Sequence, residues 1–512
     1  MRISQGLSFL LLLVFLLPVL SQAQTAYSPM RFNVSEFVVT GENPIGDKAQ
    51  QILQNFTGEQ YGLDGLSAAA DALEQEINRQ GYSFHRVSLP PQQLTSGTVE
   101  LNIVRFSMGA VNVSGNQFFS EQNIRNSLPE LSVGGTPNTK ELSRSLKIAN
   151  NHAAKNVVLR FKEGEQEDTI DADLTVTDRN PQIFFVTLDN SGSKDSKEFR
   201  STLGYQNGNL FNRDHAITAT VTVAPEDVDA TRQFGLNYHI PLYTHGANLD
   251  FLFSDSEVNS GEVGSGVEIT GKGSVFGFTY SRPMLTDTNF NHQWSVGFQH
   301  KTFENSGTLV SDVLSFPLEL GYGFNYAAKA SSLSGNLGFA MNIESGDNND
   351  DAAYMNASNR SDAKSDWSAF RYRLAYDRAF AGDWLFHAGI SGQNSSDYLI
   401  PGEQFGVGGS TTLRGFEERS VTGDSGYQTS FELWTPAISS VRYLLFIDQA
   451  KVKFNDGVDF SLSSYGLGLR WSWKQQLSIS LDYGVINEGG GLDTTINNDG
   501  DDKAHFNLIY RF

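Results

Sequence analysis

The segment Tyr465-Gly466-Leu467-Gly468-Leu469-Arg470-Trp471 decides the fold of this chain. Large apolar side chains occupy every second position, with glycine or arginine between them, and this is the period of a β-strand with one apolar and one polar face. Similar segments, such as Ile183–Leu188 and Phe234–Ile240, recur from Gln182 onward between stretches rich in glycine, asparagine, aspartate and serine. Strands of about ten residues with this alternation are typical of transmembrane β-barrels.

The number of these segments predicts an all-β transmembrane barrel over residues 181–512. About sixteen antiparallel strands can be placed there, an even number as in bacterial single-chain barrels. The last segment, His505–Phe512, carries Tyr510 and ends on the aromatic Phe512, which resembles the C-terminal assembly signal of outer-membrane barrels. Short turns alternate with long loops, and we expect the short turns on the periplasmic rim. A soluble β-sandwich or solenoid is the alternative.

The composition of the 512 residues argues against several classes of function. Basic residues number 37 and acidic residues 58, for a net charge of −21, whereas a nucleic-acid binder needs clustered basic charge. The absence of cysteine excludes disulfides, thiolate metal sites and cysteine nucleophiles. The histidines show no metal-ligand spacing, and no GxSxG nucleophile motif is present. We therefore expect no metal, no cofactor and no enzymatic activity.

The N-terminus predicts a signal peptide over residues 1–23. Arg2 precedes the apolar run Leu7–Leu17, and the small residues up to Ala23 fit a cleavage site, so the mature chain is expected to begin near Gln24. An uncleaved membrane anchor is the alternative, although this run is shorter than the ~18 residues that span a bilayer. Mean hydropathy is −0.31 and no later apolar run is long enough for a transmembrane helix. Membrane insertion would therefore require a closed barrel.

Two small α+β domains are predicted before the barrel, over residues 24–106 and 107–180. In each, a strand ends at a glycine (Gly41 or Gly115), two helices follow, and two further strands complete a three-stranded sheet. An open edge of such a sheet can recruit an extended peptide by β-augmentation; alternatively, the domains are rigid spacers. The helix markers are Leu66, Ala70, Leu73 and Ile77 in the first domain and the expected N-caps Ser120 and Thr139 in the second.

One loop and one strand of the predicted barrel carry residues suited to an internal anchor. The loop, residues 397–427, contains Leu413-Arg414-Gly415-Phe416, and the strand contains Phe446 and Asp448. Folding a long loop into a lumen requires a contact that offsets the loss of conformational entropy. Arg414 offers a forked, permanently charged donor, and Asp448 offers a carboxylate for bidentate pairing. Alternatively, Arg414 is a surface residue whose solvated ion pair contributes about 0 to 1 kcal/mol.

These residues carry a resemblance to a known family. Gly408–Phe416 is similar to the family's loop-tip motif, Val-Arg-Gly-Phe/Tyr, with Leu413 in the valine position. Phe446–Ala450 is similar to its partner motif, Phe-x-Asp-x-Gly, with alanine in place of the final glycine. Leu89–Gln92 and Val113–Asn116 resemble parts of its first and second POTRA domains. The chain thus resembles the outer-membrane transporters of two-partner secretion (TpsB), the ShlB/FhaC/HecB-type haemolysin secretion/activation proteins.

The resemblance implies a porin-like channel in the bacterial outer membrane, with the POTRA domains (24–106 and 107–180) in the periplasm and the loop around 397–427 held inside the barrel by pairing of Arg414 with Asp448. It implies export of a large, β-rich TpsA-type exoprotein, recognised by the POTRA domains and threaded unfolded through the barrel. Periplasmic chaperones, the barrel-assembly machinery and outer-membrane lipids are further expected partners.

The resemblance leaves alternatives open. A related function is assembly and insertion of other outer-membrane proteins, although such factors more often carry three or five POTRA domains. The cargo could be a haemolysin, an adhesin, a contact-dependent toxin or a haem-acquisition protein. FhaC-like members also carry an N-terminal plug helix, for which residues 24–30 are too few. We therefore expect the loop that contains Arg414 to be the chief plug.

Overall fold

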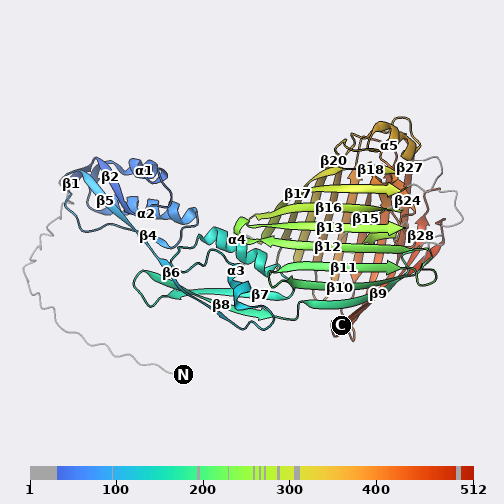
Figure 1. Ribbon diagram of the computed structural model, residues 1–512, viewed down its shortest axis with the longest axis horizontal. Helices are drawn as coiled ribbons and strands as arrows, with labels where there is room; N and C mark the ends of the chain where they lie inside the picture. Colours follow the sequence, from blue (N-terminus) through green and yellow to red (C-terminus); the bar gives the residue numbers. More distant parts are fainter. Residues whose placement is uncertain are drawn as a thin grey trace, which may run out of the picture. The chain divides into compact units, whose positions relative to one another are not determined.

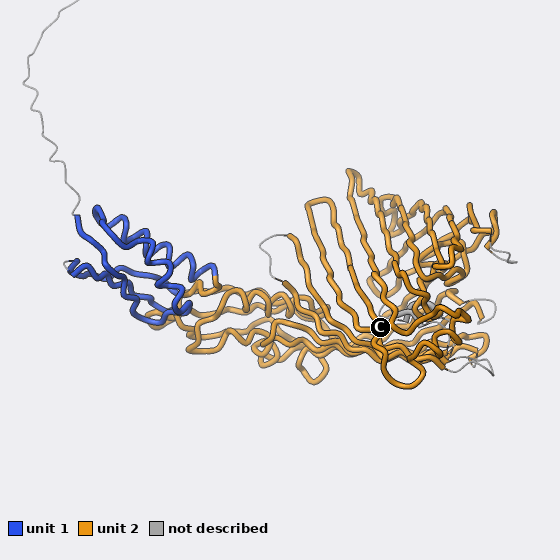
Figure 2. Tube along the Cα trace, turned by 90° about the horizontal axis from the view of Figure 1, so that it is seen from above, with its two compact units in different colours: residues 1–79, 85–105 blue, residues 80–84, 106–512 orange. Residues whose placement is uncertain are grey.

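The computed structural model describes residues 31–94, 96–192, 197–228, 230–257, 260–263, 267–269, 272–284, 289–304, 312–491 and 497–512 (Figure 1). The signal peptide expected at residues 1–23 lies outside these described residues. The chain divides into two compact units, Met1–Arg79 with His85–Arg105, and Gln80–Phe84 with Phe106–Phe512 (Figure 2). Among the described helices, none is long and apolar enough to cross a membrane.

The first unit is an α+β domain. Its main sheet has the strand order β2-β5-β4, with β2 parallel to β5 and β4 antiparallel to it. The face of α2 that carries Leu66, Leu73 and Ile77 is fully buried, as the helical spacing predicted. The elements are β1 (Arg31–Val34), β2 (Glu36–Gly41), α1 (Lys48–Leu53), the 3₁₀ turn η1 (Gln54–Phe56), β3 (Gly58–Tyr61), α2 (Asp64–Arg79), β4 (His85–Ser88) and β5 (Thr98–Arg105).

A second α+β domain with the same sheet topology begins the second unit. Its strand order is β6-β8-β7, again with one parallel and one antiparallel pair. Ser120 caps α3 as expected, since its side chain accepts a hydrogen bond from the Asn123 amide. The expected cap Thr139 is wrong: Asn138 has the extended backbone of an N-cap and accepts from two amides, and Thr139 is the first helical residue. The elements are β6 (Ser107–Ser114), α3 (Glu121–Asn126), α4 (Thr139–Asn150), β7 (Lys155–Glu163) and β8 (Thr169–Asp178).

The two domains have a glycine at the same place, Gly41 in the first and Gly115 in the second, and the backbone geometry explains why. Both have left-handed φ values, +80° and +84°. A Cβ on Gly41 would lie 2.2 Å from the carbonyl oxygen of Ile103, and one on Gly115 would lie 2.4 Å from that of Val176. In each domain, therefore, the chain leaves the first strand so close to its parallel neighbour that only glycine fits.

Most of the remaining strands form one closed antiparallel barrel, whereas β14 (Ser260–Val263) pairs with β15 (Val267–Ile269), and β23 (Phe405–Val407) with β24 (Val421–Gly423), in separate two-stranded sheets. Strands β18 and β19 both pair with β17 and are two pieces of one wall strand, so the described barrel has sixteen strands, as predicted. The strands are β9 (Gln182–Asp189), β10 (Arg200–Leu210), β11 (His215–Val223), β12 (Arg232–Leu242), β13 (Ala247–Glu257), β16 (Lys272–Met284), β17 (Phe290–Glu304), β18 (Val313–Ser315), β19 (Pro317–Ala327), β20 (Ser331–Asn342), β21 (Ser368–Ala379), β22 (Leu385–Asn394), β25 (Ser425–Trp434), β26 (Val441–Lys453), β27 (Asp459–Trp473), β28 (Leu477–Glu488) and β29 (Asp502–Arg511).

The two faces of the barrel wall differ as the alternation predicted. Ile447 and Tyr465 point outward and are half exposed, while the neighbouring Asp448 and Ser464 point inward and are buried. An apolar outer band and a polar interior are the arrangement that a lipid bilayer requires. The barrel closes where β9 pairs with β29, and Phe512 stacks on Phe184 at this seam.

A buried cluster fixes the second α+β domain to the barrel within the second unit. Asp214, in the turn between β10 and β11, binds Lys155 of β7 and accepts hydrogen bonds from Asn123 Nδ2 at 2.9 Å and Tyr243 Oη at 2.6 Å. The side chains of Lys155 and Asp214 are 0% and 1% exposed. Burial lowers the pKa of Lys155, and the adjacent Asp214 carboxylate opposes that shift. The domain is therefore held by a charge pair that water does not screen.

The loop over residues 345–366 is rich in polar residues, and it contains helix α5 (Asp351–Ser358) and part of a small core. Tyr354 and Trp367 are fully buried and pack against Leu399 and Ile400. Because most residues of the loop are polar, its sequence does not indicate this buried core. The loop is therefore packed against the chain that follows β22.

We predict that Gly115→Ala destabilises the second α+β domain by more than about 1 kcal/mol, because the new methyl group meets the Val176 carbonyl in addition to the backbone strain. Gly134→Ala is the matched control: Gly134 also has a left-handed φ, +78°, but nothing lies within 4 Å of its Cβ position. Limited proteolysis of the folded full chain against urea measures the difference. Equal losses for the two variants would contradict the close-approach argument.

Candidate functional site

The loop between β22 and β25, residues 395–424, lies against the inner face of the barrel and is called the inward loop here. It contains the 3₁₀ turn η3 (Pro401–Glu403) and a short hairpin, β23 (Phe405–Val407) with β24 (Val421–Gly423). Its apolar side chains form one buried cluster with inward residues of β26, β27 and β28. The cluster consists of Val407, Leu413, Phe416, Val421, Ala450, Val452, Leu462 and Ile486.

Arg414 and Asp448 are in direct contact inside this packed region. Arg414 Nε lies 2.7 Å from Asp448 Oδ2, and Nη2 lies 2.8 Å from Oδ1, which is a bidentate fork. The Arg414 amide donates to the same carboxylate at 3.2 Å. Ser430 on β25 also donates to Asp448, at 2.6 Å, and accepts from Arg414. Asp448 is fully buried and Arg414 is 5% exposed, so this pair is shielded from solvent.

Other acidic groups surround the Arg414 guanidinium. Glu432 on β25 lies 2.7 Å from Nη1, and Asp482 on β28 lies 3.9 Å from it. Asp482 is itself held by Arg470 of β27 at 2.8 Å. The fold thus places two arginines among three carboxylates, on four adjacent strands and the inward loop. The strand order fixes the members other than Arg414, since they lie on strands that are neighbours in the sheet.

Phe446 adds an aromatic contact to the same guanidinium. The Arg414 Cζ lies 3.6 Å from the centre of the Phe446 ring, which is cation–π geometry. Phe446 and Asp448 are two residues apart on β26 and therefore share the inward face. The ring and the carboxylate hold the guanidinium from two directions.

Gly415 lets the loop tip approach the wall backbone. It has a φ of +96°, and its Cβ position is 3.1 Å from the Gly484 carbonyl carbon on β28. A Cβ on Gly484 would meet the Gly415 nitrogen at 2.6 Å, so both glycines are needed. The Gly415 amide donates to His505 Nε2 at 3.0 Å. Leu413 and Phe416, on either side of Arg414 and Gly415, are fully buried.

The C-terminal residues lie in the barrel seam. Tyr510 pairs with Val186 of β9, and Phe512 exchanges backbone hydrogen bonds with Phe184. The ring centres of Tyr510 and Phe512 lie 5.9 Å apart.

Sequence reasoning missed several residues of the Arg414 network. Glu432, Asp482 and His505 contact the loop tip, yet none belongs to a motif. Their inward direction is readable from strand alternation, but their proximity depends on register. In the described part of the chain, no group of three or more His, Asp or Glu side chains is arranged to hold a metal ion.

Comparison with known proteins shows that the chain as a whole is similar to named transporters. The chain is 21% identical over 538 residues to the heme/hemopexin transporter protein HuxB of Haemophilus influenzae, covering 96% of this chain and 90% of that protein. It is 23% identical to the outer membrane transporter CdiB of Escherichia coli O6:K15:H31, covering 81% and 72%. The solved structure of CdiB from Escherichia coli matches with a TM-score of 0.71 at 17% identity, covering 96% of this chain and 93% of that one.

Two family descriptions match the chain directly. Residues 32–105 match the POTRA domain of ShlB type, and residues 168–471, more than half of the chain, match the haemolysin secretion/activation protein ShlB/FhaC/HecB. This family comprises secretion channels and is not a class of enzymes. The chain belongs to the ShlB/FhaC/HecB family of haemolysin secretion/activation proteins, and is an outer-membrane β-barrel transporter with its POTRA domain in the periplasm.

Proposed function

We propose that this transporter recognises a TpsA-type exoprotein through its two POTRA domains and threads it unfolded through the barrel to the cell surface. The observation that carries the proposal is the inward loop, held in the lumen by the buried pair of Arg414 and Asp448. A loop fixed there narrows the pore at rest, and its displacement makes room for a chain.

Recognition by β-augmentation is supported by the sheet edges. In the strand orders β2-β5-β4 and β6-β8-β7, the outer strands have a free side within their sheets. Free backbone N–H and C=O groups along an edge can pair with an extended peptide. On β7, Val158 is 47% exposed and offers an apolar contact to such a peptide.

Threading is supported by the chemistry of the lumen. A cavity of about 770 Å³ lies between the inward loop and the wall, and many of its lining groups are neutral amides and hydroxyls, such as Gln293, Ser295, Asn336 and Ser391. These groups can exchange hydrogen bonds with any extended backbone, whatever its sequence. Direction would come from folding of the partner outside, since a folded segment cannot slip back.

The same proposal covers the other partners. Periplasmic chaperones and the barrel-assembly machinery would deliver and insert this chain, because exposed strands aggregate before the barrel closes. Outer-membrane lipids would then surround the outward aromatic and aliphatic residues, of which Leu467 is 59% exposed.

We predict that Arg414→Ala lowers secretion of the partner by about tenfold or more, because Asp448 is left buried beside Glu432 and Asp482 without its charge partner. Secretion by Arg414→Lys should lie between that of the wild type and that of Arg414→Ala, because lysine supplies the charge but cannot form the bidentate contact. Secreted partner in culture medium is the measurement, and heat-modifiable gel migration reports barrel closure. Arg232→Ala, at an exposed arginine of β12 that pairs with Glu257, is the control and should secrete as the wild type does. Wild-type secretion by Arg414→Ala would contradict the proposal.

We predict that replacing residues 405–423 by a short glycine-serine linker raises conductance in planar bilayers, because the plugging segment is removed while the wall strands remain. A barrel that keeps its heat-dependent gel shift and shows unchanged conductance would mean that the inward loop does not obstruct the pore.

We predict that Val158→Asp weakens binding of the partner's N-terminal domain by about tenfold, because an added strand would place its side chains next to a desolvated carboxylate. Val158→Thr keeps the shape and should bind as the wild type does. Binding of the N-terminal domain to the full chain in nanodiscs is measured by biolayer interferometry. If both variants bind equally well, the β7 edge is not the recognition strand.

A further inference from the structure

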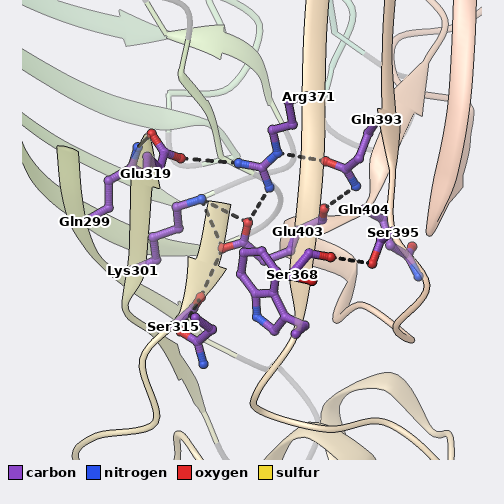
Figure 3. Close-up of polar contacts among 12 residues, drawn as sticks. Gln299, Lys301, Ser315, Glu319, Ser368, Arg371, Gln393, Ser395, Glu403 and Gln404 are labelled. Atoms are coloured by element: carbon purple, nitrogen blue, oxygen red, sulfur yellow. Dashed lines mark hydrogen bonds and ion pairs between the residues drawn. The ribbon is translucent and has the colours of Figure 1, made fainter. Parts of the chain in front are cut away.

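Glu403 is another buried charge of the inward loop, eleven positions before Arg414 (Figure 3). Its side chain has no solvent exposure. Glu403 Oε1 lies 3.0 Å from Lys301 Nζ of β17, and Oε2 lies 2.9 Å from Arg371 Nη2 of β21. Ser315 of β18 donates to the same carboxylate at 3.1 Å. The carboxylate is thus held by three separate wall strands.

The backbone of Glu403 is held as well. Gln393 of β22 donates to its carbonyl oxygen at 3.0 Å and accepts from Arg371 Nε at 2.8 Å. Arg371 therefore faces Glu403 while a wall amide orients it. Its remaining nitrogen lies 3.3 Å from Glu319 of β19. These contacts form an ordered polar cradle in which wall residues surround Glu403 of the loop (Figure 3).

The strands that hold Glu403 differ from those that hold Arg414. Arg414 is bound by β25, β26 and β28, whereas the carboxylate of Glu403 is bound by β17, β18 and β21 and its carbonyl oxygen by β22. The inward loop leaves the wall between β22 and β25, so the strands that hold Glu403 lie on one side of this point in the closed strand order and those that hold Arg414 lie on the other. The chain from Glu403 to Arg414 therefore connects two adjoining parts of the barrel wall.

We propose that Glu403 is the second anchor of the inward loop, a positioning residue that fixes the base of the loop to the wall of β17, β18 and β21 while Arg414 fixes the tip. The inference rests on the proposed function, in which this loop obstructs the export pore. Opening then requires the Glu403 contacts to be broken in addition to those of the tip, and Glu403 faces the same cavity of about 770 Å³ that Lys301 and Arg371 line.

The energetics favour an anchor over an incidental contact. A buried carboxylate without partners is strongly unfavourable, so Glu403 cannot leave its cations unless other groups replace them. Lys301, on wall strand β17, is 11% exposed and lies beside Glu403. The wall thus contains a carboxylate-binding site that the loop fills.

The test uses the purified full chain in planar bilayers. Glu403→Gln keeps the shape but removes the charge, and should raise the time spent in open states about tenfold. Asp377→Asn is the matched control: this carboxylate, on the same strand as Arg371, binds His387 of the wall at 2.8 Å, and its loss should leave gating unchanged. Unchanged gating in Glu403→Gln would overturn the inference.

A second variant separates anchoring from simple charge balance. The double variant Lys301→Gln with Glu403→Gln removes both members of one ion pair. If Glu403 served only to neutralise Lys301, this double variant would gate as the wild type does. Anchoring predicts that the double variant stays open like Glu403→Gln. Recovery of wild-type gating in the double variant would show that Glu403 is only a counter-ion.

A labelling measurement covers the case in which a variant inserts poorly into bilayers. The chain has no cysteine, so Gln404→Cys introduces a single thiol beside Glu403. Its reaction with a bulky maleimide on whole cells should be several times faster with Glu403→Gln than without it, and unchanged with Asp377→Asn. Equal rates in all three would refute the anchor. Gating and labelling need no partner, so a failure of partner secretion would count against the proposed function alone.

Discussion

The bidentate contact of Arg414 with Asp448 is the interaction on which the plugged lumen depends. Asp448 is buried because the inward loop covers it, and Arg414 is buried because β26 presents a carboxylate to it. Each charge makes the burial of the other tolerable. The apolar neighbours Leu413 and Phe416 then reach the inner wall cluster. Loop and wall are therefore parts of one packed structure, although the loop belongs to no strand of the barrel.

The strand pattern was readable from the sequence because alternation is a property of each segment alone. In the stretch around Tyr465 and Leu467, the alternating large apolar residues indicate which side faces outward, and the side chains of Tyr465 and Leu467 are exposed in the structure. Local capping was less certain. Ser120 is the N-cap of its helix as expected. In the next helix the N-cap is Asn138, one residue before Thr139, and its side-chain oxygen accepts hydrogen bonds from two backbone amides.

Some polar contacts of the inward loop can likewise be predicted from the sequence, and others cannot. The proximity of Arg414 and Asp448 follows from two motifs with complementary chemistry. Glu403 has no motif, and its partners Lys301 and Arg371 lie 102 and 32 positions away in the sequence. Such contacts depend on strand register and on the path of the loop across the lumen, which no local pattern encodes. The same reason hides the buried Trp367 within a loop dominated by polar residues.

Fastening at Glu403 and Arg414 gives the inward loop the mechanics of a strap with two hinges. If the tip alone is released, the strap turns about its base at β17 and β21 and vacates the side of β26 and β28. The base contacts of Glu403 would then keep the remainder of the loop beside β17 and β21, so release of the tip widens the lumen without freeing the whole loop.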